Sequence, residues 1–133
     1  MPISKSVMRG VDTNVLVRLI TRDDPRQTIA AERFVEKGSW VSTLVLAEAM
    51  RVLDSVYELT PAALATTVDM LLDHRDLALQ DRETVEAALR LFQSRPALGF
   101  SDCLVIESAR KAGYLPLGTF DRHLSKVDGT QKL

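Results

Sequence analysis

The chain has 133 residues, of which 46 % are hydrophobic and 26 % charged, with a formal net charge of −1. This composition suits one packed domain over residues 1–133 and excludes a largely disordered chain. A charge near zero excludes a global basic field, so any nucleic-acid contact must come from a local patch. The single cysteine excludes an internal disulfide. No run approaches the roughly 18 apolar residues of a membrane helix, so we expect a soluble cytoplasmic protein that does not contact a membrane.

The first part of the chain alternates short apolar segments with segments of helical periodicity. After a loose leader over residues 1–7, we predict short strands at residues 8–12, 39–42 and 77–80. The helical pattern predicts helices at residues 13–20, 26–37, 43–57 and 60–74. Thr60 is the expected N-cap of the last of these helices, and Pro61 its first residue.

The second part continues the alternation to the end of the chain. We predict helices at residues 81–95, 101–113 and 121–127, and strands at residues 115–120 and 130–133. Asp81 and Ser101 are the expected N-caps, and Gly113 is the expected stop. Strands that alternate with helices in this way predict a parallel sheet with helices on both faces.

Four acidic residues interrupt apolar stretches, where a charge is costly unless something compensates it. They are Asp12, Glu48, Asp102 and Asp121. Each has an ordinary explanation: Asp12 and Asp121 could cap helices, Glu48 could pair with Arg51, and Asp102 could favour the first turn of a helix. We expect Glu48 to lie on the buried face of its helix, which such an ion pair does not explain.

One explanation serves all four acids, namely a shared divalent cation. Carboxylates that converge without basic partners repel one another unless such an ion lies among them, and Mg²⁺ prefers oxygen ligands. Asn14 and Thr119 could add neutral oxygens. Zinc does not fit, because His74 and His123 are isolated and Cys103 has the character of a small core residue.

The order of the acidic motifs resembles that of the PIN-domain ribonucleases. The segments are "VDTNVLVRLI", "STLVLAEAMRVL", "FSDCLVIESARKAG" and "PLGTFDRHL", and the resemblance covers residues 8–133. The nearest branch is the VapC-like toxins of type II toxin–antitoxin systems. The resemblance implies a three-layer α/β/α domain with a mostly parallel central sheet of four to five strands.

The same resemblance implies an activity and a set of roles. It implies hydrolysis of single-stranded RNA that depends on Mg²⁺ or Mn²⁺, with Asp12 and Asp102 in direct contact with the metal. Glu48 would orient or deprotonate the attacking water, and Asp121 would complete the cage. Thr119 matches the small hydroxyl residue before the last acid. Many relatives carry a further acid where this chain has Gly99.

The resemblance also implies partners. It implies a homodimer that binds a small antitoxin and arrests growth when the antitoxin is absent. The helices at residues 26–37 and 61–73 are candidate surfaces, since both are rich in small and apolar residues.

Basic and aromatic residues near the motifs are further candidates. Arg18, Arg51 and Arg122 could contact RNA phosphates, although ordinary surface charge or helix ion pairing explains them as well. Trp40 could stack on a base but suits a core or interface position better.

Two other enzyme or binding classes use acids at strand ends. A haloacid-dehalogenase-like phosphatase needs a second acid two residues after its nucleophile, and that position is Asn14. A receiver-type signalling domain needs an acidic pair at the end of its first strand and a later lysine, which the segment 120–122 lacks. A degenerate PIN scaffold that only binds a partner is the third alternative, against which the four retained acids argue.

Overall fold

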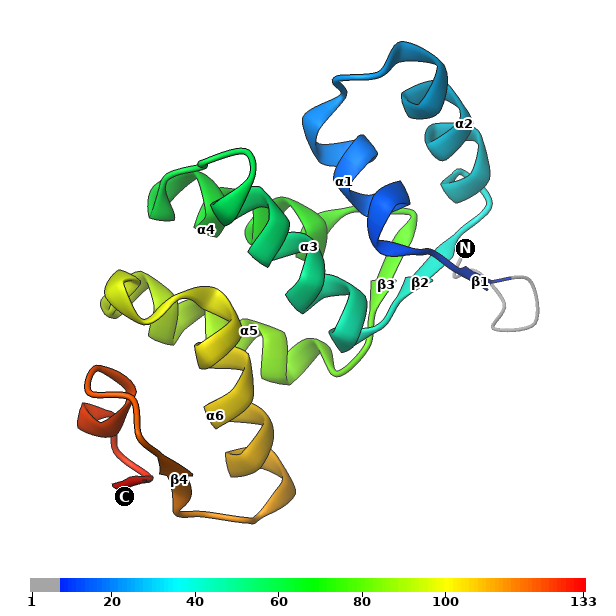
Figure 1. Cartoon of the computed structure of the whole chain (residues 1–133). Coiled ribbons are helices and arrows are strands. Elements are labelled where there is room, and N and C mark those ends of the chain that lie inside the picture. The colour runs from blue at the N-terminus through cyan, green and yellow to red at the C-terminus, as the bar shows by residue number, and fades with distance from the viewer. Residues whose placement is uncertain (1–7) are drawn as a thin grey trace. The chain divides into compact units, whose positions relative to one another are not determined.

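The computed structural model describes residues 8–133, so the leader predicted at residues 1–7 lies outside the described residues (Figure 1). Contacts divide the chain into two compact units, Met1–Arg82 and Glu83–Leu133, called here unit 1 and unit 2. The prediction of one domain over the whole chain stays a prediction. Within residues 8–133, every helix is too short or too polar to cross a membrane.

Unit 1 is built on a parallel sheet. Its strands are β1 (Arg9–Gly10), β2 (Ser39–Val41) and β3 (Leu77–Leu79), in the order β1-β2-β3. Its helices are α1 (Thr13–Thr21), α2 (Pro25–Val35), α3 (Thr43–Ser55) and α4 (Pro61–Asp73). Ser39 of the central strand lies beside Arg9 on one side and Leu77 on the other.

The helices of unit 1 begin at polar caps that the sequence supplies. The Asp24 carboxylate accepts from the amide of Gln27 at the start of α2. The Thr60 hydroxyl accepts from the amide of Ala63, and Pro61 is the first residue of α4, as predicted. Such a cap satisfies an amide that has no partner inside the helix and contributes about 1 kcal/mol.

Apolar residues of the helices close the core of unit 1. Helix α1 packs against α2 and α3, and α4 packs against α3 and β3. Leu16, Leu53 and Val68 are fully buried there, together with Val41 of the central strand. The residues on the buried side of α3 are Leu46, Ala49, Met50 and Leu53.

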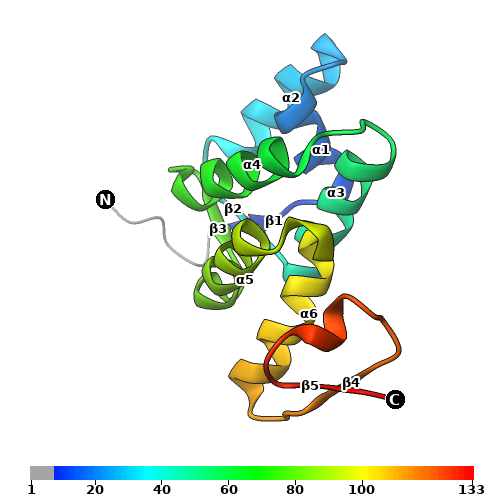
Figure 2. The ribbon, with the colours of Figure 1, turned by 90° about the vertical axis from the view of Figure 1, so that its left-hand side faces the viewer.

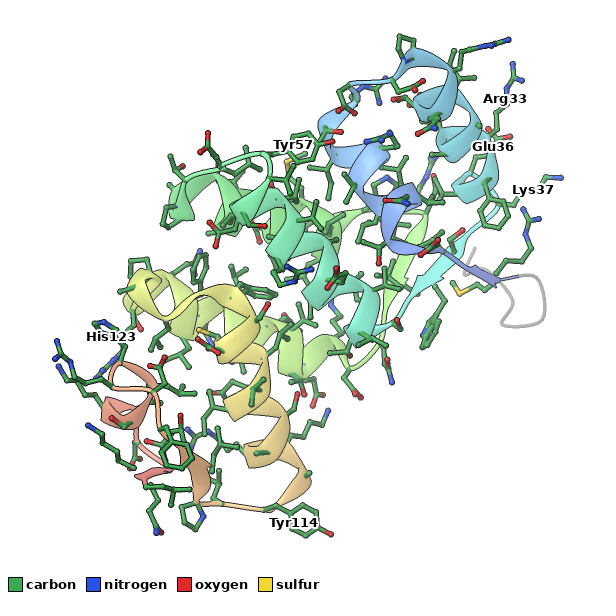
Figure 3. All side chains as sticks on the ribbon, viewed as in Figure 1. Arg33, Glu36, Lys37, Tyr57, Tyr114 and His123 are labelled. Atoms are coloured by element: carbon green, nitrogen blue, oxygen red, sulfur yellow. The ribbon has the colours of Figure 1, made fainter. Side chains whose placement is uncertain are left out.

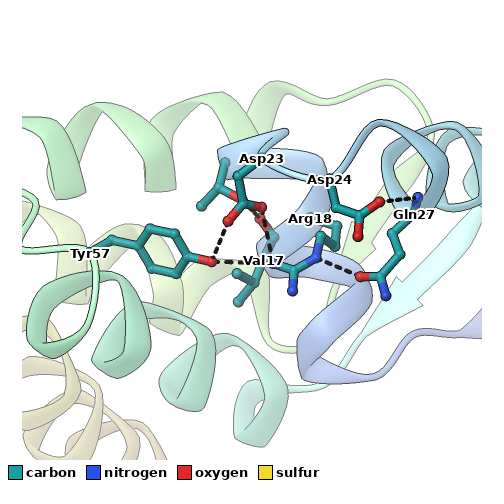
Figure 4. Close-up of polar contacts among 7 residues, drawn as sticks. Val17, Arg18, Asp23, Asp24, Gln27 and Tyr57 are labelled. Carbon is teal, nitrogen blue, oxygen red and sulfur yellow. Dashed lines mark hydrogen bonds and ion pairs between the residues drawn. The ribbon is translucent and has the colours of Figure 1, made fainter.

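A polar network fastens α1 to the loop before α2 and to the segment after α3 (Figure 4). Arg18 donates to the Gln27 side-chain oxygen over 2.6 Å and to Asp23 over 3.1 Å. The Tyr57 hydroxyl accepts from Arg18 and donates to Asp23 over 2.8 Å. Hydrogen bonds from Thr21 and Tyr57 lower the pKa of Asp23, so the carboxylate stays ionised.

Tyr57→Phe should therefore lower the free energy of unfolding by roughly 1–2 kcal/mol, because it removes hydrogen bonds to two charged partners. Urea unfolding measures the change as a lower midpoint at constant slope. Tyr114→Phe is the matched control, since Tyr114 is exposed and its hydroxyl should be worth less than about 0.5 kcal/mol. An equal loss in both variants would show that the Tyr57 network does not stabilise unit 1.

Unit 2 has a smaller parallel sheet of two strands. Its helices are α5 (Arg82–Ser94), which begins at the unit boundary, and α6 (Phe100–Ala112), with the short 3₁₀ turns η1 (Pro96–Leu98) and η2 (Leu124–Lys126). Its strands are β4 (Leu117–Thr119) and β5 (Thr130–Lys132). They run side by side in Figure 2, with Leu117 beside Thr130 and Thr119 beside Lys132.

The core of unit 2 lies along α5 and α6. Phe92 and Phe100 meet edge to face with ring centres 5.9 Å apart, and Cys103 and Ile106 are buried. Arg110 donates to the carbonyl of Asp128 over 2.7 Å, which fixes α6 to the turn before β5. Burial raises the pKa of the Cys103 thiol to about 12, consistent with the predicted core position.

The structure confirms the α/β class and the parallel strands, with differences in detail. The five strands found within residues 8–133 form two sheets of three and two strands, one in each unit. Asp81 has a left-handed backbone (φ 50°), whereas an N-cap is typically extended, so the predicted cap is wrong. Ser101 is also not a cap: α6 begins at Phe100, and Gly99 holds the cap position without a side-chain hydrogen bond. The helix predicted at residues 121–127 is only the turn η2.

Candidate metal centre and nuclease site

Asp12 lies where β1 leads into α1. Its backbone is extended, it holds the N-cap position, and its Oδ1 accepts from the amide of Thr13 over 2.6 Å. The preceding residue, Val11, donates to the carbonyl of Trp40, so the sheet fixes the chain just before the acid. The capping explanation therefore holds for one oxygen of Asp12, while the carboxylate as a whole is exposed.

Glu48 lies on α3 and is bound by Arg51 through two hydrogen bonds of 2.6 and 3.1 Å. The bond from Arg51 lowers the pKa of Glu48, so the acid is ionised at neutral pH. The expectation of a buried face is wrong. The Glu48 side chain is 45 % exposed, and Leu44, one turn earlier on the same face, is 80 % exposed. The buried side of α3 is the adjacent one, which carries Ala49 and Leu53.

Asp121 follows β4 and is held by backbone amides. Its Oδ1 accepts from the amides of His123 and Leu124, both over 2.8 Å, and its own amide donates to the Thr119 hydroxyl. The bond from Leu124 lowers the pKa of Asp121, and the bond and positive charge of His123 add to this effect. A carboxylate bound in this way stays ionised and keeps a fixed orientation.

Asp102 lies in the first turn of α6 and is partly buried. Burial raises the pKa of its carboxyl group, and the negative charge of Asp121 raises it further. The repulsion falls on Asp102 because the amide donors keep Asp121 ionised. Two carboxylates in unit 2 are thus close enough to interact.

Gly99, where the resemblance leads one to expect a further acid, has a backbone conformation that favours glycine. Its φ is +80°, and although a side chain would meet no atom within 4 Å, an L-residue would be strained there. The backbone that starts α6 beside Asp102 therefore depends on glycine.

The structure brings together some of the predicted site residues. Asp102, Asp121 and Thr119 lie near one another in unit 2. Asp12 and Glu48 belong to unit 1, where each has its own local partner. Within either unit, residues 8–133 contain no group of three His, Cys, Asp or Glu side chains arranged to hold a metal ion. A centre of four carboxylates stays a prediction.

The donor chemistry of unit 2 fits a hard divalent cation. The carboxylates of Asp102 and Asp121 offer only oxygens, and the negative charge of Asp121, which adds to the effect of burial on the pKa of Asp102, favours a cation beside the pair. Mg²⁺ or Mn²⁺ commonly binds through one or two carboxylates and retains water. Cys103 is buried and not ionised, so it does not add a thiolate that would favour zinc.

The other predicted contacts occupy varied positions. Arg18 belongs to the network of Figure 4, and Arg51 binds Glu48. Arg122 is exposed after Asp121. Trp40 is 41 % exposed, so the core expectation for it is wrong. Asn14 lines a hollow of about 430 Å³ between α1 and α2. Contact of the arginines with RNA stays a prediction.

Sequence reasoning did not single out Phe120, an aromatic residue next to the acid pair. Its side chain is 80 % exposed directly before Asp121. The sequence did contain one sign of an unusual residue, namely a large apolar side chain between two polar residues at the end of a predicted strand. Burial, which decides whether such a residue is unusual, is not visible in the sequence.

Comparison with known families agrees with the motif order. The PIN domain family matches residues 11–130, a range that includes all four acids and extends over both units. The chain belongs to the PIN domain family. PIN domains are typically metal-dependent nucleases that use divalent ions such as Mg²⁺ or Mn²⁺. No curated protein matches the chain. Neither the receiver-type nor the phosphatase alternative gains support.

Asp102→Asn should raise the melting temperature in a chelator at pH 7 by about 3 °C. The raised folded pKa means that ionised Asp102 destabilises the fold, and asparagine removes that charge. Wild-type stability should fall as pH rises from the unfolded value, about 3.9, through the higher folded pKa. The advantage of the variant should therefore shrink at pH 4. Thermal melts measure both effects.

Asp69→Asn is the control for the loss of one negative charge, because Asp69 is exposed on α4. It should leave the melting temperature unchanged within error. Equal behaviour of the two variants at both pH values would contradict the repulsion between Asp102 and Asp121.

Proposed function

We propose that this protein is the toxin of a type II toxin–antitoxin system and that it hydrolyses RNA phosphodiester bonds at a site made by Asp12, Glu48, Asp102 and Asp121. The observation that carries the proposal is the pair of interacting carboxylates, Asp102 and Asp121, in a chain of the PIN family. A divalent ion bound there would lower the pKa of a water molecule, orient it and offset charge on the phosphate.

The acids have different roles in this proposal. Asp102 and Asp12 bind the ion directly, and Asp121, whose Oδ1 is occupied by two amides, offers its other oxygen as a preoriented ligand. Glu48 orients or deprotonates the attacking water, which requires an ionised carboxylate, and its bond to Arg51 favours that state.

The arginines also have a role in this proposal. Arg51 is held beside Glu48 and is 62 % exposed, so its guanidinium can also meet a phosphate oxygen. Arg122, next to Asp121, can do the same. Arg18 is the weakest of the three candidates because Gln27, Asp23 and Tyr57 already occupy it.

Asp12→Asn and Asp102→Asn should each lower the rate of RNA cleavage by more than about 100-fold, since loss of outer-shell partners alone costs 10- to 100-fold. Both variants should keep the wild-type circular dichroism. The assay follows a labelled single-stranded RNA with Mg²⁺ or Mn²⁺ and with a chelator. Asp69→Asn should cleave normally. Wild-type activity in folded Asp12→Asn would remove Asp12 from the site.

Two further measurements test the metal and the toxin role. Mn²⁺ at 100 times its Kd should stabilise the wild type by about 2.7 kcal/mol and Asp102→Asn by less. Expression should arrest growth, and Asp12→Asn should abolish the arrest. Mapping the 5′ ends of cleaved RNAs after brief expression identifies the RNA.

The antitoxin would bind unit 1 at α2 and α4. Support comes from a hollow of about 570 Å³ that these helices form with α1 and β3. Its apolar lining is Leu19, Ile20, Val35, Met70, Leu71 and Leu77. Glu32 and Asp76 of the lining pair with Arg22 and Arg75, so the support comes from the apolar lining, which suits the apolar face of an amphipathic segment.

Met70→Glu should weaken antitoxin binding at least about tenfold, because Met70 is 67 % exposed and lines the hollow. RNA cleavage by the free variant should not change. Val56→Glu, at an equally exposed residue that does not line the hollow, is the matched control. Titration calorimetry with the protein encoded next to this chain measures both. Equal affinities would exclude the hollow as the docking surface.

The proposal includes a homodimer in the cytoplasm. Exposed apolar residues such as Leu44 and Val105 support an interface between copies, and the single buried thiol suits a reducing compartment. Light scattering that gives only the monomer mass at micromolar concentration would contradict the dimer.

A further inference from the structure

A second hollow of unit 1 shares no residue with the hollow assigned to the antitoxin. It lies between α1 and α2 and has a volume of about 430 Å³, within the range of small-molecule sites. Its lining includes Asn14, Val15, Arg18, Gln27, Ala31 and Phe34. The lining combines apolar side chains, one of them aromatic, with two side-chain amides. This combination suits a ligand that has a flat ring with hydrogen-bonding groups on its edge.

The charge on this lining is already compensated within unit 1. Arg18 pairs with Asp23 over 3.1 Å, and its Nε donates to the Gln27 side-chain oxygen over 2.6 Å. Among the described residues of the lining there is no carboxylate. A charged group inside the hollow would lose its hydration without gaining a new counter-charge, so the hollow suits an uncharged part of a ligand.

Two side-chain amides of the lining keep hydrogen-bonding capacity. Gln27 uses its oxygen for Arg18, which orients the amide and leaves its NH₂ group as a donor. The side-chain amide of Asn14 is exposed and has no hydrogen-bond partner within residues 8–133, so it can both donate and accept. An amide that donates and accepts side by side matches the N6 and N7 edge of adenine, which Asn and Gln recognise in this way.

The Phe34 ring adds a flat apolar surface with a cation against it. The Arg9 guanidinium lies 3.9 Å from the centre of the ring and donates to the Phe34 carbonyl over 3.4 Å. Phe34 also lines the hollow, so its ring contacts the guanidinium on one side and the hollow on another. The cation–π contact orders the ring that a base would cover. Arg9 is exposed and keeps further N–H groups for an acceptor such as phosphate.

Positive charge prevails around this end of α2. Arg33 directly precedes Phe34, and Lys37 lies in the turn after the helix, where Glu36 keeps a right-handed backbone. Figure 3 shows the side chains of Arg33, Glu36 and Lys37 on the side of α2 that faces away from α1. Together with Arg9, the two cations outweigh the single acid. The surface outside the hollow therefore favours an anionic group.

We propose that the hollow between α1 and α2 binds an adenine nucleotide, with the base against Phe34 and the phosphates at Arg9. The uncharged lining receives the base, the amides of Asn14 and Gln27 recognise its edge, and the cations outside attract the phosphates. The inference concerns unit 1 alone and does not depend on the nuclease or the antitoxin proposal. A bound nucleotide would join α2 to α1, the helix that Asp12 caps.

The test is equilibrium dialysis of ATP, UTP and adenosine against the full chain in a chelator. ATP should bind with a Kd below about 1 mM. UTP, whose base lacks the N6 and N7 edge, should bind at least about fivefold more weakly, the low end for one bidentate contact. Adenosine should also bind more weakly than ATP, because it brings no phosphate to Arg9.

Gln27→Glu tests the recognition of the base. The variant keeps an oxygen for Arg18 but replaces the NH₂ donor by a negatively charged acceptor. It should raise the Kd of ATP at least about fivefold, the effect of one lost hydrogen bond. An acid in the first turn of α2 is favourable, so the variant should melt no lower than the wild type. Gln93→Glu, at an exposed position of α5, is the matched control and should not change the Kd.

Two further variants test the ring and the phosphate contact. Phe34→Leu should weaken ATP and adenosine alike, by about 2- to 12-fold, the range for one aromatic pair. Phe120→Leu, at an exposed ring of unit 2, is its control. Arg9→Gln should weaken ATP by about two- to fivefold, as expected for an exposed charge, and adenosine less. Arg90→Gln, at an exposed cation of α5, should change neither.

Other results overturn the nucleotide site. ATP that does not bind at concentrations up to about 5 mM would exclude it. An unchanged Kd in Gln27→Glu, or equal affinity for ATP and UTP, would show that the amides do not recognise adenine. A short oligoadenylate that binds where ATP does not would assign the hollow to an RNA strand instead. If Phe34→Leu melts lower than the wild type, Gln27→Glu decides the matter.

Discussion

Repulsion between two carboxylates is the constraint on which the candidate site in unit 2 depends. The fold fixes Asp121 through amides at η2 and places Asp102 in the first turn of α6, so neither acid can move far from the other. Burial and the charge of Asp121 together raise the pKa of Asp102. Free energy stored in this way is released when a cation or a proton arrives. The local fold is therefore organised for charge neutralisation rather than for maximal stability.

In unit 1, unlike at Asp102, the charge of each of the two acids is compensated by a local partner. Asp12 completes a helix start and Glu48 is neutralised by Arg51, so each acid is satisfied where it stands. A helix cap or an ion pair of this kind compensates the charge at little cost in free energy. Each acid, taken alone, is therefore explained by its local partner. The family match covers the positions of all four acids, and their convergence in one site stays a prediction. Local geometry and family membership thus supply separate parts of the functional argument.

The sequence predicted element types well because they follow from local periodicity and capping chemistry. Thr60 with Pro61 marked the start of α4, and Gly113 marked the end of α6. The predictions that were wrong concern features that tertiary packing and backbone conformation determine. Which side of α3 is buried depends on its neighbours, so the Glu48 face was misjudged. The start of α6 depends on the positive φ of Gly99, which the letters do not reveal.

The state of Cys103 has a practical consequence for chemical labelling. The thiol is fully buried and burial raises its pKa to about 12, so at pH 8 it is almost entirely protonated. An introduced surface cysteine would have a pKa near 8.5 and a substantial thiolate fraction. Maleimide or haloacetyl dyes would then attach at the introduced position while the native thiol is left unmodified. A chain with one native cysteine can in this way be handled as if it had none.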